Sequence, residues 1–399
     1  MRVAFIQTTM IVGGAETLLV NLIRRLDRTR FQPELVCLKD RGPLGDLLAD
    51  EVPVHANLLS GKHDLRVLPR LARLLRKRKI DAVVTVGAGD KMFWGRLAAK
   101  RAGVPVIAAA LHSTGWPDVV GRLNRMLTPW TDAFIGCAPS HGRFLVEQER
   151  FPAAKVFVIP NGVDTQRFAP PVDRAAIRAE LGLHPTAPVV GILAALRPEK
   201  NHEMFLHVAA LVRRQLRDAR FLVIGDGPRR AELEALAQEL GLADYVCFLG
   251  NRDDVPRVIG ATDVMTLTSR IEASPVSILE AMAVGRPVVA TRVGSVAETV
   301  TEGQTGCLVD SDDQAAMVDR VAELLCDPLR AEAYGRAGRT WVVQQRSLSV
   351  MVEGYEELLE DLYQRKSSRR PMRQPAGAPG DLATLDLRAP ALLVHPAES

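Results

Sequence analysis

The sequence predicts an α/β protein built from two doubly wound, Rossmann-like domains. Short runs rich in β-branched and apolar residues alternate with longer stretches of helical periodicity. This alternation is typical of a parallel sheet covered by helices on both faces. The pattern occurs twice, with a proline-containing segment between its two occurrences. The length of 399 residues also exceeds what one hydrophobic core usually supports, so two domains are expected.

The expected elements follow the chain in order. Strands of the first domain are predicted at residues 3–9, 33–38, 52–58, 82–86, 104–111, 133–138 and 156–160. Strands of the second domain are predicted at residues 189–194, 220–224, 245–249, 264–267, 288–290 and 306–309. We therefore place the first domain at residues 1–165 and the second at residues 188–345. A C-terminal helix is expected at residues 346–365, and a disordered tail rich in Pro, Arg, Gly and Ala at residues 366–399.

Composition restricts the function classes. Residues 1–164 hold 24 Lys and Arg against 15 Asp and Glu, a net charge of +9, whereas the remainder holds 27 against 32, or −5. A basic first half favours an anionic partner, such as a membrane surface or an acidic acceptor, and no motif supports nucleic-acid binding. The five cysteines lack metal-ligand spacing and indicate a reducing compartment. Because no signal peptide or membrane-spanning run is recognisable, a cytoplasmic protein is expected.

A basic amphipathic helix is expected at residues 66–79. Its leucines and valine gather on one side, and its arginines and lysines on the other. Such a helix can cover a sheet with its apolar stripe and leave its cations in solvent, or it can lie on an anionic membrane. We expect the stripe to pack on the sheet and the cations to allow peripheral membrane contact.

The stretch 272–290 holds the strongest functional signal. Ser274 is a good helix N-cap, and Pro275 suits the first helical position. The free N–H groups of a helix N-terminus are a natural seat for a phosphate. Glu272 precedes this seat, and Glu280 lies about 7.5 Å along the helix from Pro275. Because Glu272 lies before the first turn and Glu280 in the second, we expect the two carboxylates to be further apart than the roughly 5 to 9.5 Å of a hydrolase acid–base pair. The two carboxylates could bind hydroxyls on either side of a diphosphate, or could be ordinary loop and helix-surface charges.

The spacing of these residues resembles a known signature. Glu272 and Glu280, followed by Ala-Met-Ala and Gly-x-Pro-Val-Val at residues 281–289, resemble the donor site of family 4 glycosyltransferases, a retaining group with the GT-B fold. The resemblance implies two domains facing across a cleft and a C-terminal helix that returns to the first domain. It implies that Glu272 contacts the transferred sugar and Glu280 the ribose. The amides of Ser274 and Val276 would hold the phosphates.

Two positions near the expected donor depart from the family pattern. The family often has glycine where this chain has Ala273, and it has arginine where this chain has Ala195. Arg197, two residues further on, would point to the same side of an extended strand and reach the same phosphate. Lys200 fits the family lysine, and preorganised cations of this kind stabilise a diphosphate leaving group without a metal.

Further site residues follow strand ends, where ligands bind in open α/β sheets. Gly13 and Gly14 lie between the first strand and its helix, and the family has a similar Gly-Gly loop at the cleft. His112 ends another strand, and the resemblance places it beside the donor sugar. Backbone groups near Gly250 and Arg252 are expected to contact the nucleotide base.

Other family positions show no evident chemistry. The Pro-Asn-Gly-Val-Asp turn at residues 160–164 has structural character, because Asn-Gly is a turn former. Gly294, Glu298 and the Thr-Gly pair at 305–306 complete the pattern without an evident task.

Together these features predict a metal-independent retaining glycosyltransferase without a cofactor. Its donor would be a nucleoside diphosphate sugar, and its acceptor a glycan or lipid-linked molecule in cell-envelope or extracellular polysaccharide synthesis. A GT-B epimerase and a non-catalytic sugar-nucleotide-binding subunit remain as alternatives. Ala195 slightly favours the second alternative, whereas the intact glutamates and Lys200 oppose it.

Overall fold

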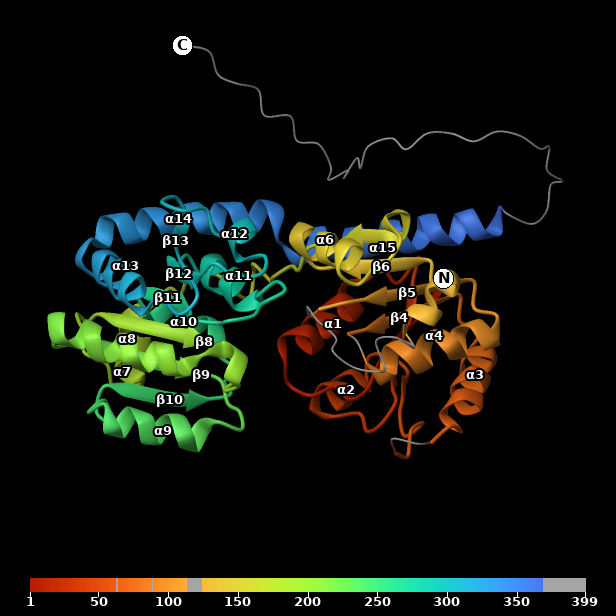
Figure 1. Cartoon of the computed structure of the whole chain (residues 1–399), viewed down its shortest axis with the longest axis horizontal. Helices are drawn as coiled ribbons and strands as arrows, with labels where there is room; N and C mark the ends of the chain where they lie inside the picture. The colour runs from red at the N-terminus through yellow and green to blue at the C-terminus, as the bar shows by residue number, and fades with distance from the viewer. Residues whose placement is uncertain (62–63, 88, 113–123, 369–399) are drawn as a thin grey trace, which may run out of the picture.

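The computed structural model describes residues 1–61, 64–87, 89–112 and 124–368. Figure 1 shows two lobes side by side, each with strands at its centre and helices around them. Both sheets are parallel throughout the described residues, with strand orders β3-β2-β1-β4-β5-β6-β7 and β10-β9-β8-β11-β12-β13. In each order the chain starts near the middle and reverses direction, which is the doubly wound arrangement. The predicted fold class is confirmed.

Every run of residues expected to form a strand overlaps one. The strands of the first lobe are β1 (Arg2–Gln7), β2 (Gln32–Cys37), β3 (Val54–His55), β4 (Ala82–Val86), β5 (Val106–Ala110), β6 (Ala133–Gly136) and β7 (Val156–Val158). Those of the second lobe are β8 (Val189–Leu193), β9 (Arg220–Ile224), β10 (Val246–Gly250), β11 (Val264–Leu267), β12 (Val288–Thr291) and β13 (Gly306–Val309). Their side chains are mostly buried because helices cover both faces.

The helices fill the intervals between strands. In the first lobe they are α1 (Gly14–Arg25), α2 (Pro43–Leu48), α3 (Val67–Arg78), α4 (Asp90–Ala102) and α6 (Pro139–Glu147), with 3-10 turns η1 (Thr128–Trp130) and η2 (Ala153–Lys155). In the second they are α7 (Arg174–Glu180), α8 (His202–Gln215), α9 (Arg230–Glu239), α10 (Val255–Ala261), α11 (Val276–Ala283), α12 (Val296–Thr299), α13 (Gln314–Cys326) and α14 (Pro328–Gln345), with η3 (Pro198–Lys200).

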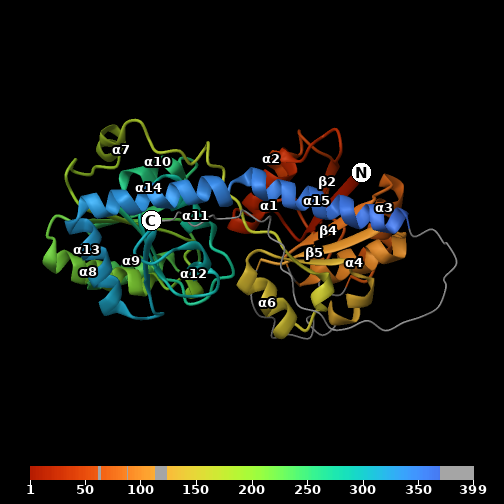
Figure 2. The same ribbon diagram turned by 90° about the horizontal axis from the view of Figure 1, so that it is seen from above.

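The C-terminal helix returns to the first lobe. Figure 2 shows α14 on one lobe and α15 (Leu348–Ser367) on the other, running nearly end to end. Apolar side chains of α15, including Met351, Tyr355 and Leu359, belong to the core of the first lobe. The returning helix is therefore confirmed, and it extends two residues beyond the expected end at 365. The predicted disordered tail lies, from residue 369 onward, outside the described residues.

The carboxyl ends of the two sheets face each other. Asn161, which follows β7, donates from Nδ2 to the carbonyl of Ser274, which follows β11, at 3.0 Å. Ser140, at the start of α6, donates from its amide to Glu298 of α12 at 2.9 Å. These contacts join segments that leave the carboxyl edges of both sheets, where ligands bind in such folds.

Helix α3 packs as its apolar stripe predicts. Four of its residues are buried, namely Val67, Leu71, Ala72 and Leu75, and they join a core cluster with strand residues of the first sheet. Arg70 and Arg78 form ion pairs with Asp64 and Glu34. The remaining basic side chains of the segment are exposed, namely Arg66, Arg73, Arg76, Lys77 and Lys79. Within the described ranges, no helix has the length and apolar character needed to cross a membrane.

Candidate active site

Helix α11 begins one residue later than the sequence predicts. Ser274 does not cap it. Pro275 occupies the cap position with φ −71° and ψ 117°, and no side chain bonds to the first turn. The proline ring holds φ near −65°, so an extended cap is inexpensive here, and Val276 becomes the first helical residue. The first N–H groups of α11, starting with that of Val276, have no partner within the helix. They remain available for a ligand such as a diphosphate.

Two residues predicted to act in catalysis are in contact. Lys200 ends η3, and its Nζ donates to Oε1 of Glu272 at 2.6 Å. The same oxygen accepts from Ser269 Oγ at 2.7 Å, and only 8% of Glu272 is exposed. Thr268 Oγ1 donates to the carbonyl of Lys200 at 3.0 Å, which links the two loops. The structure therefore places a buried carboxylate and a cation together beside the start of α11.

Gly294 explains how the loop at Glu272 is held. Its φ of +53° is in the left-handed region that favours glycine. A Cβ at this position would lie 1.7 Å from the carbonyl oxygen of Glu272, closer than any packing allows. Gly294 therefore permits the backbone contact that positions Glu272, a task that sequence analysis did not assign. Ala273 is not among the residues with positive φ, so alanine is unstrained there.

Glu280 lies in the second turn of α11 with a free carboxyl group. No hydrogen bond or ion pair to it occurs within the described ranges. Burial raises its pKa to about 7, and the charge of Arg167 opposes this rise. The carboxyl group therefore changes protonation near neutral pH, and its ionised form could accept hydrogen bonds from ribose hydroxyls.

Arg197 and Ala195 do not lie on an extended strand, contrary to the prediction. Strand β8 ends at Leu193, so the alternation of side chains along a strand does not extend to these positions. The backbone turns instead, and the amide of Arg197 donates to the carbonyl of Ala195 at 2.8 Å. Arg197 is exposed. Its contact with a donor phosphate stays a prediction.

The glycines of the second lobe place backbone against backbone. A Cβ on Gly225 would lie 2.2 Å from the carbonyl oxygen of Ala194, and one on Gly227 would lie 2.6 Å from that of Leu196. The turn after β9 thus braces the loop that leads to Lys200. The carbonyl of Gly250 accepts from the amide of Gly225 at 2.9 Å, and Gly250 has φ +65°.

Arg252 lies just beyond this turn. Its Nε and Nη2 donate to the carboxylate of Asp254, both at 2.7 Å. The guanidinium of Arg252 is therefore already paired with a neighbouring acid. The predicted contact with a nucleotide base concerned its backbone, which this ion pair does not involve. The predicted contacts of Gly250 and Arg252 with a nucleotide base remain predictions.

The first lobe contributes a glycine turn at the opposite edge. Gly13 is the extended N-cap of α1, and Gly14 is its first residue. A Cβ on Gly14 would meet nothing within 4 Å, so this surface is open to a ligand. Glu16 lies in the first turn of α1 as expected and accepts from Gln7 Nε2 at 3.2 Å.

His112 follows β5, and burial lowers its pKa to about 4, with further contributions from His141 and Lys91. The imidazole is therefore neutral at physiological pH. Its Nδ1 is buried and has no hydrogen-bond partner in the part of the chain that the structure describes. A neutral ring with one unoccupied nitrogen suits a hydrogen-bonding role toward a sugar.

Sequence analysis missed Lys91, the second residue of α4. Its Nζ lies so near the end of β4 that a Cβ on Gly87 would approach it to 2.9 Å. Burial lowers its pKa, and the charge of Glu16 opposes this. The ammonium forms no hydrogen bond or ion pair with any residue that the structure describes. A lysine just after a strand end was the available signal, since that edge faces the second lobe.

Glu298 joins the two lobes. It accepts from the amide of Ser140 at 2.9 Å, from Ser140 Oγ at 3.1 Å and from Arg143 at 3.1 Å. A carboxylate at the first turn of α6 is stabilised by the free N–H groups and dipole of that helix. The family position without an evident task is therefore an interdomain contact.

Two family models match this chain. The model for Glycosyltransferase Family 4 matches residues 12–167, and the model for Glycosyl transferases group 1 matches residues 173–341. Together they cover well over half of the chain. The chain belongs to the group 1 glycosyltransferases. The resemblance seen in the sequence is confirmed.

Known relatives of this glycosyltransferase span most of its length. It is 33% identical to the GDP-mannose-dependent alpha-(1-6)-phosphatidylinositol monomannoside mannosyltransferase of Mycolicibacterium smegmatis, over 77% of this chain and 82% of that enzyme. It is 27% identical to an Escherichia coli UDP-Gal:alpha-D-GlcNAc-diphosphoundecaprenol alpha-1,3-galactosyltransferase, over 82% of this chain and 88% of that enzyme.

Solved structures support the fold of this glycosyltransferase. Anabaena Alr3699/HepE in complex with UDP superposes with a TM-score of 0.80 at 22% identity, covering 90% of this chain and 100% of that one. WaaG, a glycosyltransferase of lipopolysaccharide biosynthesis, gives 0.72 at 15% identity, with coverage of 90% and 99%. The GT-B fold is thereby confirmed.

Proposed function

We propose that this glycosyltransferase transfers a hexose, with retention of configuration and without a metal, from a nucleoside diphosphate sugar to a lipid-linked acceptor of the cell envelope. The observation that carries the proposal is the start of α11. Free helix N–H groups lie there between Glu272 and Glu280. Glu272 is paired with Lys200, whereas the carboxyl group of Glu280 has no partner among the described residues. These groups match the three parts of a sugar nucleotide, namely sugar, diphosphate and ribose.

The proposed reaction is a front-face substitution. The acceptor oxygen bonds to the anomeric carbon on the face from which the diphosphate leaves, and the bond from that carbon to the diphosphate oxygen breaks. The acceptor proton passes to the leaving phosphate oxygen, which accounts for every atom. Retention follows because attack and departure share a face.

Charge on the leaving diphosphate is stabilised by fixed groups. The N-terminus of α11 and the Lys200 ammonium supply positive charge where the bond breaks, and groups that need no rearrangement stabilise such charge well. Glu272 holds Lys200 in place before the donor arrives. The independence from a metal and the lack of a cofactor are parts of this proposal.

Lys91 supports an anionic acceptor. Its unpaired ammonium lies on the first lobe, near enough to His112 to lower the pKa of that imidazole. A phosphate on the acceptor would compensate the positive charge, because a partly buried cation is costly until it is paired. The acceptors in the names of both relatives above carry phosphate or diphosphate. We infer the same class here.

The exposed cations of α3 support peripheral attachment to the cytoplasmic side of an anionic membrane. Attraction of this kind weakens as salt screens the charges. Sedimentation with phosphatidylglycerol vesicles should fall with salt and fall further in the variant Arg73→Glu with Arg76→Glu. The matched change Arg336→Glu, at an exposed arginine of the second lobe, should have less effect. Binding that is absent or independent of salt would remove the membrane from the proposal.

The transfer assay tests the reaction itself. The full chain would be incubated with UDP-glucose, UDP-galactose or GDP-mannose, with phosphatidylinositol monomannoside or a GlcNAc-diphospholipid as acceptor, and with excess EDTA. Proton NMR of the new glycosidic bond should show the anomeric configuration of the donor. An inverted anomeric configuration would contradict the proposed retention. Activity that appears only after a metal is restored would contradict the proposed independence from a metal.

The same assay separates the alternatives left open by the sequence. An epimerase would convert the donor without using the acceptor. A non-catalytic subunit would bind nucleotide but would yield no product with any pair. Transfer to an acceptor is the outcome that the paired Lys200 and Glu272 favour.

A further inference from the structure

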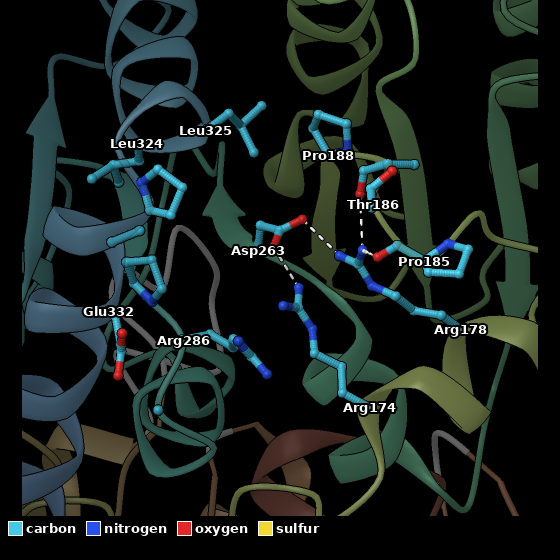
Figure 3. A pocket seen from close by; sticks show the side chains of 15 residues that line it. Arg174, Arg178, Pro185, Thr186, Pro188, Asp263, Arg286, Leu324, Leu325 and Glu332 are labelled. Carbon is cyan, nitrogen blue, oxygen red and sulfur yellow. Dashed lines mark hydrogen bonds and ion pairs between the residues drawn. The ribbon is translucent and has the colours of Figure 1, made fainter.

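A second, basic pocket lies at the amino edge of the second sheet, opposite the edge that holds the proposed donor seat. Its cavity has a volume of about 520 Å³. Pro188, Asp263 and Pro287, which line it, immediately precede β8, β11 and β12. Figure 3 shows Arg174, Arg178 and Arg286 directed into this space around Asp263. No residue of the proposed active site lines the pocket.

One of the three arginines is fully engaged by protein. Arg178 donates to Asp263 Oδ2 at 2.7 Å and to the carbonyls of Pro185, Ala187 and Ala261. Only 4% of its side chain is exposed. Asp263 also pairs with Arg174 and accepts from the amide of Val189 at 2.8 Å. The same Nη2 of Arg174 donates to the carbonyl of Thr262 at 2.9 Å, which leaves its Nη1 and Nε without a partner among the described residues. The single carboxylate of this cluster is therefore consumed by Arg178 and Arg174.

Arg286 forms no ion pair with any acid among the described residues. Its Nη2 donates to the carbonyl of Gly260 at 2.7 Å, a neutral group that does not balance its charge. Burial, together with the charges of Arg174 and Arg178, lowers the pKa of Arg286 to about 10, and the charge of Asp263 opposes this. Glu332 lies on the rim, but its carboxylate is turned away in Figure 3 and pairs with Arg336.

Two buried N–H groups of the pocket also lack acceptors. The Nε atoms of Arg174 and Arg286 are both inaccessible to solvent and meet no hydrogen-bond partner in the part of the chain that the structure describes. Leaving a buried donor unpaired is costly, more so when it is charged. Figure 3 shows the two side chains extending toward one another below Asp263. Excess positive charge and unused donors thus occur at the same place.

We propose that Arg174 and Arg286 form a binding site for a small phosphate monoester such as a sugar phosphate. The planar guanidinium fork matches the oxygen atoms of a phosphate and pairs with it in a bidentate manner. The cavity is larger than a phosphate group, and Leu324, Leu325 and Pro328 supply an apolar wall for the remaining part of the ligand.

This site is separate from the donor seat. Arg286 follows the C-terminal end of α11, whereas the donor seat lies at the first residue of the same helix. The eight residues of α11 span about 12 Å at 1.5 Å per residue. A monoester bound at Arg286 and a sugar nucleotide bound at Val276 can therefore be present together. The inference does not depend on the reaction proposed above.

A purely structural role accounts for some residues of this arginine cluster but not for Arg286. Arg178 and Asp263 tie the linker to the starts of β8 and β11 and need no ligand. The side chain of Arg286 has a single hydrogen bond to protein in the described ranges, and an uncharged donor could supply it. The unbalanced charge of Arg286 is what a bound anion would compensate.

Calorimetric titration of the full chain with glucose 6-phosphate and with inorganic phosphate tests the site. The variant Arg286→Gln removes the guanidinium charge and should weaken monoester binding by about tenfold or more, since one charge-assisted pair is lost. Arg320→Gln, which removes an exposed arginine of the same lobe, should bind as the wild type does. Lys200→Ala, which alters the donor seat, should also leave binding unchanged.

Each result decides the proposal. Equal binding by Arg286→Gln and the wild type, or loss of binding only in Lys200→Ala, would overturn it. Tighter binding of glucose 6-phosphate than of inorganic phosphate is expected, and the reverse would reduce the site to one for free phosphate. If Arg286→Gln fails to fold, phenylglyoxal labelling of the wild type replaces it. Glucose 6-phosphate should then protect Arg286 and Arg174 but not Arg320, and equal labelling with and without the ligand would overturn the proposal.

Discussion

The Nζ atom of Lys200 lies 2.6 Å from Oε1 of Glu272, although 72 residues separate them in the sequence. The pair joins the loop after β8 to the loop after β11 at the carboxyl edge of the second sheet. Because Glu272 is almost fully buried, its charge depends on Lys200 and on the hydroxyl of Ser269 for compensation. A donor diphosphate would give Lys200 a second anionic partner without moving it far.

The first prediction concerns the coupling between these residues. In a double-mutant cycle with Lys200→Met and Glu272→Gln, we expect a coupling energy of about 1 to 3 kcal/mol in the free energy of unfolding, since one partner is buried. The exposed pair Arg270 and Asp312 is the control and should couple by less than about 1 kcal/mol. Urea unfolding measures both cycles. Equal coupling in the two pairs would show that the buried contact has no special energetic role.

The second prediction concerns Gly294. The change Gly294→Ala should destabilise the fold and lower turnover, because its Cβ would overlap the carbonyl of Glu272 and displace that loop. Gly303→Ala is the matched control, with a similar positive φ of +71° but no neighbour nearer than 3.9 Å. We expect Gly303→Ala to cost only the backbone strain, about 1 kcal/mol, with normal turnover. Similar turnover in the two variants would contradict the positioning role.

The third prediction is a pH dependence at Glu280. Burial raises the pKa of Glu280 in the folded protein to about 7, above the ordinary value of 4.5. The folded state therefore holds this proton more tightly, and stability should fall as pH rises from about 4.5 to about 7. In Glu280→Gln this loss should be absent. Thermal unfolding from pH 4 to pH 8 measures the difference between the two proteins.

Binding of nucleotide should show the opposite trend at Glu280. The ionised carboxylate accepts hydrogen bonds from ribose hydroxyls, so the wild type should gain affinity for UDP or GDP relative to Glu280→Gln as pH rises through about 7. Taking the ratio of the two dissociation constants removes the titration of the nucleotide itself. A ratio that stays constant from pH 5 to pH 8 would argue against contact between Glu280 and the ribose.

The fourth prediction assigns the acceptor phosphate to Lys91. Lys91→Ala should raise the KM for a phosphate-bearing acceptor by about tenfold or more, since a charge-assisted hydrogen bond is lost, with little change in the KM for the donor. Lys100→Ala removes an exposed lysine from the same helix and should leave both values unchanged. An acceptor analogue without phosphate should be used equally well by all three proteins. If Lys91→Ala affects only the donor, the ammonium serves the sugar nucleotide instead.

Much of the fold follows from local patterns. The alternation of β-rich runs and helical periodicity predicts both sheets, because each element carries its own periodicity. Strand ends are less certain, and this produced the error at Arg197, where the chain turns after Leu193. The N-cap was misplaced for a similar reason. Ser274 and Pro275 both favour a helix start, and only the three-dimensional structure shows which of them the helix follows.

Contacts between distant segments could not be predicted from local patterns. Glu298 accepts a hydrogen bond from Ser140, and Gly294 packs against the carbonyl of Glu272. No periodicity in the sequence links either residue to its partner. Lys91 is a candidate because its partly buried ammonium has no ion-pair or hydrogen-bond partner among the described residues, which a sequence does not show. The resemblance to family 4 glycosyltransferases supplied the roles of Glu272 and Glu280, which spacing alone left open.

The proposed donor seat depends on the N–H group of Val276, and one substitution removes that group alone. Proline is tolerated at the first position of a helix, and Pro275 already has the extended backbone that a following proline requires. Calorimetric titration of UDP and GDP into Val276→Pro and Val276→Ala is therefore the most direct measurement. We expect the preferred nucleotide to bind about tenfold or more weakly to Val276→Pro, because a charge-assisted hydrogen bond is lost, and normally to Val276→Ala. Equal affinity in the two variants would contradict the claim that α11 holds the diphosphate.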